Sequence, residues 1–392
     1  MSSTTKIGVG TFSANAKTRE LVNRVLDTGR ISYGPLSKEL ERRFADLHRS
    51  NFGVLSNSGT SSLQVALQAL KLLNGWEDGD EVIVPAVTFV ATANIVLHNR
   101  MKPVFVDVER DYYGIDPQKI EAAITPRTRA IIPVHLFGLP CEMRPIVGLA
   151  NKHDLKIIED SCETMFVGYH GSPVGTWGDV GCFSFYVAHL LTAGVGGIAV
   201  TDDPRLAEKM RSLVNHGRDG VYISIDDDDG KAKEVMSRRF SFTDVGHSFR
   251  ITELEAAVAL GQLDDWFEMI HARQFNANYL IKGLEPLQRD GRLQLPSVRD
   301  GATHAFMMFP IVLNHENKWG LCAHLESCGI ETREMLPLIN QPAYAPCVTP
   351  GQFPVAEWIN NNGFYVGCHQ GLTVNDLDAI IKAIKIYYEI HV

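Results

Sequence analysis

Short apolar runs alternate with segments of helical periodicity between residues 50 and 260. The runs are rich in valine and isoleucine and show little polar alternation, which is typical of parallel strands buried on both faces. Helical patterns at 61–73 and 91–97 fall between them. The alternation predicts an α/β domain of the doubly wound kind, with a mostly parallel sheet. The predicted strands are residues 81–85, 103–107, 130–134, 156–160 and 197–201.

The pattern changes after residue 264. An amphipathic stretch at 266–284 predicts a connecting helix, and the remainder mixes strand and helix patterns. We therefore predict a large α/β domain over 1–264, which includes the N-terminal segment, and a smaller α+β domain over 265–392. The acidic run at 226–229 is interpreted as a solvated loop. In the smaller domain, the predicted elements are a strand at 306–312 and helices at 318–327 and 377–390.

Composition and charge narrow the function. The chain has 392 residues and a formal net charge of −9, which argues against nucleic acid or an anionic membrane as its main partner. It shows neither a membrane-spanning apolar run nor the apolar start of a signal peptide, so we expect a cytoplasmic protein. Its seven cysteines form no CxC or CxxC pair, and we expect reduced thiols without a metal or iron–sulfur site.

Two segments at predicted strand ends carry candidate chemistry. Residues 56–62, Ser-Asn-Ser-Gly-Thr-Ser-Ser, follow a short strand at 53–55 and open a helix, where backbone N–H groups can bind an anion. An ordinary helix N-cap explains this segment equally well. Asp160 ends another strand and could pair with the protonated ring nitrogen of pyridoxal phosphate, or it could cap a helix.

The segment at 183–197 places His189 between Ser184 and a glycine turn that contains Gly194, Gly196 and Gly197. Apolar residues lead into a polar island, and the glycines permit a tight turn before the next strand. A lone histidine is usually a hydrogen-bonded structural residue. Its position between a possible anion ligand and a tight turn favours a catalytic role.

Further short motifs occur in a fixed order along nearly the whole chain. They are residues 34–35, 58–60, 85–94, 133–138, 159–160, 184–186, 194–197, 249–253, 261–263, 341–342, 353–354 and 371–373. Each is weak alone, but the set in this order is specific. It resembles the DegT/DnrJ/EryC1/StrS family, which consists of fold type I pyridoxal phosphate enzymes acting on nucleotide-linked keto-sugars.

The resemblance implies a cofactor site. Phe89 matches the aromatic residue that stacks on the pyridine ring, and Asp160 matches the carboxylate that pairs with the ring nitrogen. Together, stacking and ion pairing can hold the cofactor without a covalent bond. The implied phosphate ligands are Gly59, Thr60, Ser61 and Ser184.

Two residues depart from the family pattern at this site. Ser248 stands where the family usually has an asparagine that the neighbouring subunit contributes to the phosphate, and Glu163 replaces a glutamine or histidine beside the ring. The resemblance implies a homodimer with shared active sites. Candidate contacts to the nucleotide-sugar substrate are Arg250, Arg333 and His369.

The main departure is His189, which stands where aminotransferases of the family carry the lysine that binds the cofactor covalently. Imidazole forms no such stable link, but it can move protons at neutral pH. This replacement resembles the sugar 3-dehydratases, which use pyridoxamine phosphate to remove a C3 hydroxyl. Their iron–sulfur branch has closely spaced cysteines, which this chain lacks. The sequence fits better with the branch typified by GDP-4-keto-6-deoxymannose 3-dehydratase, in which glutamate regenerates pyridoxamine phosphate.

Two alternatives stay open. The chain could be a nucleotide-sugar aminotransferase that has lost its lysine by mutation, or a non-catalytic protein that binds pyridoxal or pyridoxamine phosphate. Asp160 argues against the second, because a protein without chemistry has less need of a partner for the ring nitrogen. Nucleotide contacts in the family come from variable loops, so GDP, CDP and dTDP sugars all remain candidates.

Overall fold

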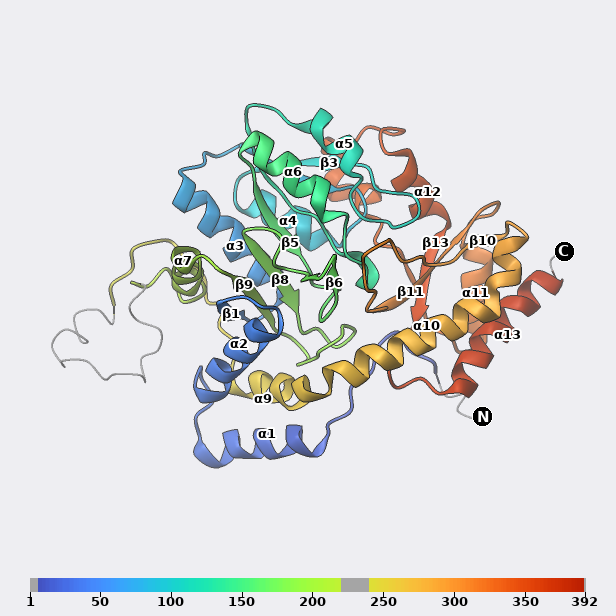
Figure 1. Cartoon of the computed structure of the whole chain (residues 1–392), viewed down its shortest axis with the longest axis horizontal. Coiled ribbons are helices and arrows are strands. Elements are labelled where there is room, and N and C mark those ends of the chain that lie inside the picture. Colours follow the sequence, from blue (N-terminus) through green and yellow to red (C-terminus); the bar gives the residue numbers. More distant parts are fainter. Residues whose placement is uncertain (1–5, 220–239, 391–392) are drawn as a thin grey trace.

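The computed structural model describes residues 6–219 and 240–390, so the acidic run at 226–229 lies outside the described residues. A seven-stranded sheet with the order β1-β9-β8-β5-β4-β2-β3 forms the centre of the larger part (Figure 1). Its strands are β1 (Phe52–Ser56), β2 (Glu81–Pro85), β3 (Lys102–Val106), β4 (Thr128–Ile131), β5 (Lys156–Asp160), β8 (Val180–Ser184) and β9 (Gly197–Thr201).

The sheet is mostly parallel, as predicted, but β9 runs antiparallel to both β1 and β8. The reason is the connection between β8 and β9. It folds back through the glycine turn instead of crossing the sheet in a helix, and only antiparallel neighbours can be joined in this way. This short connection carries His189, so the antiparallel pairing of β8 and β9 also keeps the histidine near the end of β8.

Helices flank the sheet, and α3 (Gly59–Asn74) packs across β1, β8 and β9. Its predicted bounds of 61–73 were two residues late at the start and one residue short at the end. At the edge of the molecule, α1 packs against α9 (Figure 1). The other main helices of this part are α1 (Ala16–Thr28), α2 (Pro35–Leu47), α4 (Val90–His98), α6 (Met143–His153), α7 (Pro204–Val214) and α9 (Glu253–Gln262).

A second sheet, of four antiparallel strands in the order β10-β11-β13-β12, lies in the C-terminal part. The long helix α10 (Trp266–Arg289) runs to it from α9 (Figure 1). The remaining elements are β10 (Leu293–Gln294), β11 (Met308–Leu313), α11 (Trp319–Ser327), β12 (Thr332–Glu334), α12 (Pro354–Asn362), β13 (Gly363–Gly367) and α13 (Val374–Ile390).

The chain crosses between the two main hydrophobic cores more than once. Along α10, Ile270 packs in the core of the large sheet and Ala277 packs in the core of the second sheet. Ile7 belongs to the second core and pairs with Ile330, although it lies near the N-terminus. A boundary at 264/265 therefore describes most of the packing. It does not describe the N-terminal segment around Ile7, which packs in the C-terminal core.

A buried carboxylate joins two of the short motifs. Glu253, the first residue of α9, accepts backbone hydrogen bonds from Gly34 (2.9 Å), Leu36 (2.9 Å) and Ser37 (2.8 Å) at the start of α2. A negative charge at a helix N-terminus satisfies free N–H groups and complements the helix dipole. A Cβ atom at Gly34 would lie 2.6 Å from Nε of Arg30 and 3.1 Å from the Glu253 carboxyl carbon, so a larger residue would push on both side chains.

Among the described residues, we find no helix that is both long and apolar enough to cross a membrane. The same residues contain no group of three or more His, Cys, Asp or Glu side chains that could hold a metal ion. All seven cysteines are free. The expected absence of an iron–sulfur cluster stays a prediction.

Candidate active site

A cavity of about 300 Å³ lies at the carboxyl ends of β5 and β8. This is the edge at which open α/β sheets bind ligands. Side chains from the second sheet and from the segment before it close the opposite wall, with Met307 and Tyr365 among them. The predicted site residues that line it are Gly59, Thr60, Phe89, Asp160, Glu163, Ser184 and His189.

Asp160 is buried at the end of β5, with 4% of its surface exposed. One oxygen accepts a hydrogen bond from the Thr92 hydroxyl (2.8 Å), and the other accepts one from the backbone N–H of Cys162 (3.2 Å). Both partners are neutral, and burial raises the pKa of the carboxyl above its usual range. A buried carboxylate with neutral partners is costly, and a cation in the cavity would compensate it.

The N-terminus of α3 lies beside the end of β8. Ser58 caps the helix by accepting from the backbone N–H of Ser61 (3.0 Å). At Gly59, a Cβ atom would lie 2.6 Å from the Cβ of Ser184 and 2.7 Å from the sulfur of Cys162. Glycine therefore lets the helix start approach the strand end, and the first N–H groups of a helix are a general kind of anion-binding group.

Ser61 takes a different place from the one predicted. Its hydroxyl donates to the Asn57 side chain (2.7 Å), and it is not among the lining residues. Within this chain it therefore orders the turn, whereas Gly59 and Thr60 border the cavity. Phe89 also borders the cavity, directly before α4, and leaves 57% of its surface exposed. An aromatic face this open is available for a planar ligand.

His189 lies half-buried in the β8–β9 connection. Its Nδ1 lies 3.4 Å from the carbonyl oxygen of Ser184, and its ring contacts Tyr186 edge-on at 5.7 Å between centroids. A carbonyl only accepts, so this contact favours the tautomer with the proton on Nδ1 and the lone pair on Nε2. Burial lowers the pKa of the imidazole to about 4, and at neutral pH it is an uncharged base.

The structure gives a physical reason for the acidic residue at position 163. One oxygen of Glu163 accepts a hydrogen bond from the backbone N–H of Phe137 (2.9 Å). Burial, together with the nearby Asp160, raises the pKa of Glu163 to about 7, although the hydrogen bond from Phe137 acts in the opposite direction. A substantial fraction of the group is therefore protonated at neutral pH, and a protonated carboxyl can donate a hydrogen bond as the family's usual glutamine does.

The remaining predicted residues lie outside this cavity. Arg250 donates to Ser248 (2.9 Å), and both are exposed beside Asn215. Arg333 is exposed on β12, paired with Glu331.

His369, a predicted substrate contact, is buried. Its Nδ1 accepts from the backbone N–H of Gly371 (3.2 Å), and its carbonyl accepts from Asn276 (2.9 Å). This environment suits a structural histidine.

Sequence reasoning missed several residues of the site. Thr92 orients Asp160, and its signal was present, because it stands in the motif at 85–94 one helical turn after Phe89. Tyr186 also lay inside a recognised motif. Met307, just before β11, and Tyr365, on β13, also line the cavity. No local pattern could have predicted them, since their place depends on how the two cores pack.

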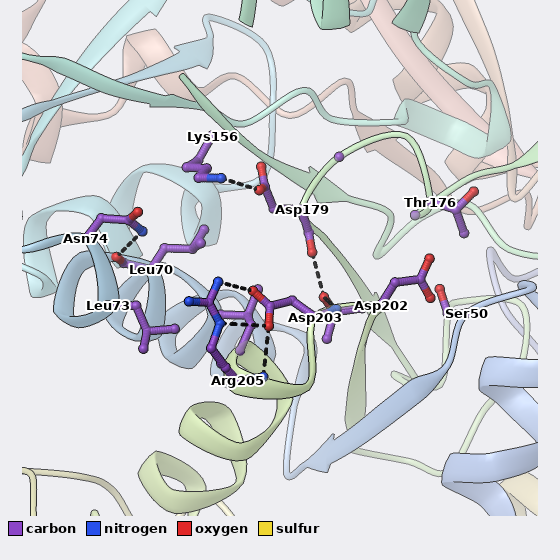
Figure 2. Close-up of a pocket in the computed structure, with 14 residues that line it drawn as sticks. Ser50, Leu70, Leu73, Asn74, Lys156, Thr176, Asp179, Asp202, Asp203 and Arg205 are labelled. Atoms are coloured by element: carbon purple, nitrogen blue, oxygen red, sulfur yellow. Dashed lines mark hydrogen bonds and ion pairs between the residues drawn. The ribbon is translucent and has the colours of Figure 1, made fainter. Parts of the chain in front are cut away.

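A separate cavity of about 240 Å³ lies toward the opposite end of the sheet, near the start of β5 and the end of β9 (Figure 2). Most of its charged side chains pair with one another. Lys156 binds Asp179 at 2.8 Å, and Arg205 binds Asp203 at 3.2 Å. This pairing is typical of a solvated protein surface, so we assign the chemistry to the cavity around Asp160.

Comparison with known proteins agrees with the geometry. Residues 13–385 match the DegT/DnrJ/EryC1/StrS aminotransferase family. GDP-perosamine synthase of Caulobacter vibrioides is 34% identical over 389 residues, which cover 98% of this chain and 99% of that protein.

Solved structures extend the likeness to the fold. DesV of S. venezuelae superposes with a TM-score of 0.85 at 32% identity, over 95% of each chain. A histidine-to-asparagine variant of GDP-4-keto-6-deoxymannose-3-dehydratase (ColD), with bound GDP-perosamine, has a TM-score of 0.87 at 24% identity. That match covers 96% of this chain and 100% of ColD, and at this identity it concerns the fold alone. The predicted fold class is confirmed.

Proposed function

Because the chain belongs to the DegT/DnrJ/EryC1/StrS aminotransferase family, we propose that it is a pyridoxamine phosphate-dependent 3-dehydratase of a nucleotide-linked 4-keto-6-deoxyhexose. His189 carries this proposal. It lines the cavity in the place of the family's cofactor-binding lysine, and no lysine occurs among the described residues that line the cavity. Such a site has a proton carrier but lacks an amine that could hold the cofactor covalently.

The cavity fits this cofactor. Asp160 offers a buried carboxylate with neutral partners, which suits a protonated pyridine nitrogen. The open ring of Phe89 suits stacking, and the N–H groups that begin α3 suit a phosphate. When bound, the cofactor supplies an electron sink. These residues would hold it without a covalent bond.

The protein's own contribution is then proton transfer and positioning. With its Nδ1 proton directed at the Ser184 carbonyl, neutral His189 can accept a proton at Nε2. The resulting imidazolium is a stronger acid than free imidazolium, since burial disfavours its charge, and it can pass that proton to the departing C3 hydroxyl. Glu163, held by the Phe137 N–H, can donate a hydrogen bond into the same cavity in its protonated form.

The overall reaction balances with glutamate as the reductant. The sugar loses its C3 hydroxyl and gains hydrogen there, which is a two-electron reduction. Glutamate is oxidised to 2-oxoglutarate, and its nitrogen leaves as ammonia. We propose glutamate as the donor, a homodimer as the assembly and the cytoplasm as the location. Ser248 and Arg250 lie outside their own chain's cavity, which is the placement that a contribution to the partner subunit's site requires.

Transamination at C4 is the second candidate, and the name of a relative favours it. GDP-perosamine synthase is similar to this chain over its full length. Transamination would need a residue at position 189 that both releases the cofactor and reprotonates the sugar, as lysine does. The imidazole can do the second but not the first, and this is why we prefer dehydration.

The products separate the two reactions. The protein is incubated with pyridoxamine phosphate, glutamate and a panel of GDP-, CDP- and dTDP-linked 4-keto-6-deoxyhexoses. Dehydration yields a sugar lighter by one oxygen atom and one ammonia for each 2-oxoglutarate, whereas transamination yields an amino sugar and no ammonia. Borohydride treatment of the pyridoxal phosphate-loaded protein should label no lysine. An amino sugar as the main product would overturn the proposal.

A further inference from the structure

A guanidinium group lies buried directly behind the active-site cavity. Arg273, in the second turn of α10, has no exposed surface and is the largest fully buried side chain among the described residues. Arginine is almost never fully buried unless it is paired with a carboxylate. Here its hydrogen bonds go to uncharged oxygen atoms, and none of its described partners is a carboxylate. Burial lowers the pKa of the guanidinium to about 10, which leaves it charged at neutral pH.

The partners of Arg273 come from three separate segments. One terminal nitrogen donates to the carbonyl of Met307 (2.8 Å), before β11, and the other donates to the carbonyl of His189 (3.3 Å). The Nε atom donates to the side chain of Gln370 (3.1 Å), between β13 and α13. His189 and Met307 both line the cavity, so a single side chain fixes the backbone of two of its walls.

We propose that Arg273 is a positioning residue, which fixes the backbone that carries His189 and places a permanent positive charge behind the imidazole. The planar guanidinium is suited to this task, because its five N–H donors can reach several carbonyl groups at once. Its action on turnover rests on the proposed role of His189. Its action on the His189 imidazole does not depend on which reaction the enzyme performs.

The charges around His189 explain why such a group is useful. Asp160 and Glu163 share the cavity, and a negative charge on either one favours imidazolium; Tyr186 and Tyr365 add neutral phenols. Arg273 acts in the opposite sense. After burial, its charge is a further cause of the lowered His189 pKa. The imidazole thus stays an uncharged base although it lies near two carboxyl groups.

Two substitutions distinguish the effect of Arg273 on the position of the backbone from the effect of its charge on His189. R273K keeps the positive charge, but one ammonium cannot reach the carbonyls of His189 and Met307 and the Gln370 side chain together. R273Q removes the charge and keeps some hydrogen bonding. The matched control is R299Q, because Arg299 is also buried but pairs with Glu109 away from the cavity. Thermal unfolding of each full-length variant checks that it folds.

The readout is the NMR titration of histidine Cε1–H signals, with His189 assigned by its loss in H189N. In the unsubstituted protein and in R299Q, His189 should stay neutral down to about pH 5. R273Q should begin to protonate His189 above that pH. R273K should keep the titration but lose roughly tenfold or more in kcat with little change in KM.

An unchanged His189 titration in R273Q would overturn the electrostatic part of the inference, and full turnover by R273K would overturn the positioning part. If R273Q does not fold, the kcat of R273K still decides the positioning part. The titration needs no substrate, so a failure of the proposed dehydration would leave this test standing.

Discussion

The charged residues at the two ends of β5 lie in opposite kinds of environment. At its start, Lys156 binds Asp179 at 2.8 Å, and the second oxygen of Asp179 accepts the backbone N–H of Ile157, so both charges are compensated in a partly exposed setting. At its end, Asp160 is buried and has only the neutral hydrogen-bond donors of Thr92 and Cys162. One strand thus carries a charge in an ion pair at its start and, at its end, a buried carboxyl whose hydrogen-bond donors are both neutral.

The difference teaches where to look for function in this fold. Paired surface charges change the stability of the fold little, and they require no functional explanation. A buried carboxylate without a cation lowers stability and needs another reason to be there. The exposed ring of Phe89 and the neutral base at His189 lie around the same cavity as Asp160. Together they indicate that this end of the sheet is arranged for a ligand.

The largest effect on turnover should come from a substitution in the cavity at the carboxyl end of β5. His189→Asn should lower turnover by roughly 10²–10⁴, the usual share of a positioned acid–base group, because the amide cannot take up a proton. Cofactor binding should persist, since the substitution leaves Asp160 and Phe89 intact. Single-turnover rates with bound cofactor measure this, with His153→Asn on the surface of α6 as the control. Near-full turnover by His189→Asn would mean that the proton carrier is another group, with Glu163 the first to test.

Asp160→Asn should produce two effects of opposite sign. Cofactor affinity should fall about tenfold or more, because a charge-assisted hydrogen bond becomes a neutral one. The cofactor-free protein should be as stable or more stable, since a buried charge with neutral partners has been removed. Equilibrium dialysis and denaturant unfolding measure the two quantities. Loss of stability together with unchanged affinity would show that Asp160 is structural.

Lowering the pH should reduce the free energy of unfolding, because the carboxyl end of β5 lies beside His189, a base that the folded structure keeps unprotonated. Burial lowers the pKa of His48, His189 and His369 to about 4 and that of His304 to about 3. Between the ordinary value of 6.5 and these values, the unfolded state binds more protons, so the free energy of unfolding falls as pH falls. Glu163, with its pKa raised to about 7, and His135, with its pKa raised to about 9, act in the opposite sense, so two groups oppose the four histidines.

Urea unfolding of the cofactor-free protein at several pH values between about 7 and about 4.5 tests this expectation. A free energy of unfolding that stays constant or rises as the pH falls over this range would contradict the expectation.

The smallest effect should come from the other end of β5. Lys156→Ala should change the free energy of unfolding by less than about 1 kcal/mol, because partly exposed ion pairs contribute little and Asp179 keeps its bond to the Ile157 N–H. Turnover should not change. If Lys156→Ala reduced activity as strongly as Asp160→Asn, the contrast between the two ends would not hold.

The sequence predicted the fold class and most of one wall of the site. Continuous apolar runs and short motifs located β5, β8 and the start of α3, because in those places the local pattern and the chemistry coincide. It did not predict Arg273, Met307 or Tyr365. Met307 and Tyr365 line the cavity from the second sheet and the segment before it, and Arg273 of α10 lies behind it, so only the packing of the two cores brings these residues to the site. His369 was a candidate substrate contact in sequence, and in the structure it is buried.

The hydrogen bonds from the start of α2 to Glu253 determine how early this helix can be stabilised during synthesis. Gly34 and the Glu253 that binds its N–H are separated by 219 residues. A ribosome adding roughly 5–20 residues per second needs about 10–45 s to make that stretch. Until then α2 lacks its cap and α1 lacks α9, the helix on which it packs. The first helices to be synthesised should therefore be among the last to become protected. Protease should cut within 16–47 in nascent chains halted before residue 253, and the completed chain should resist cleavage there.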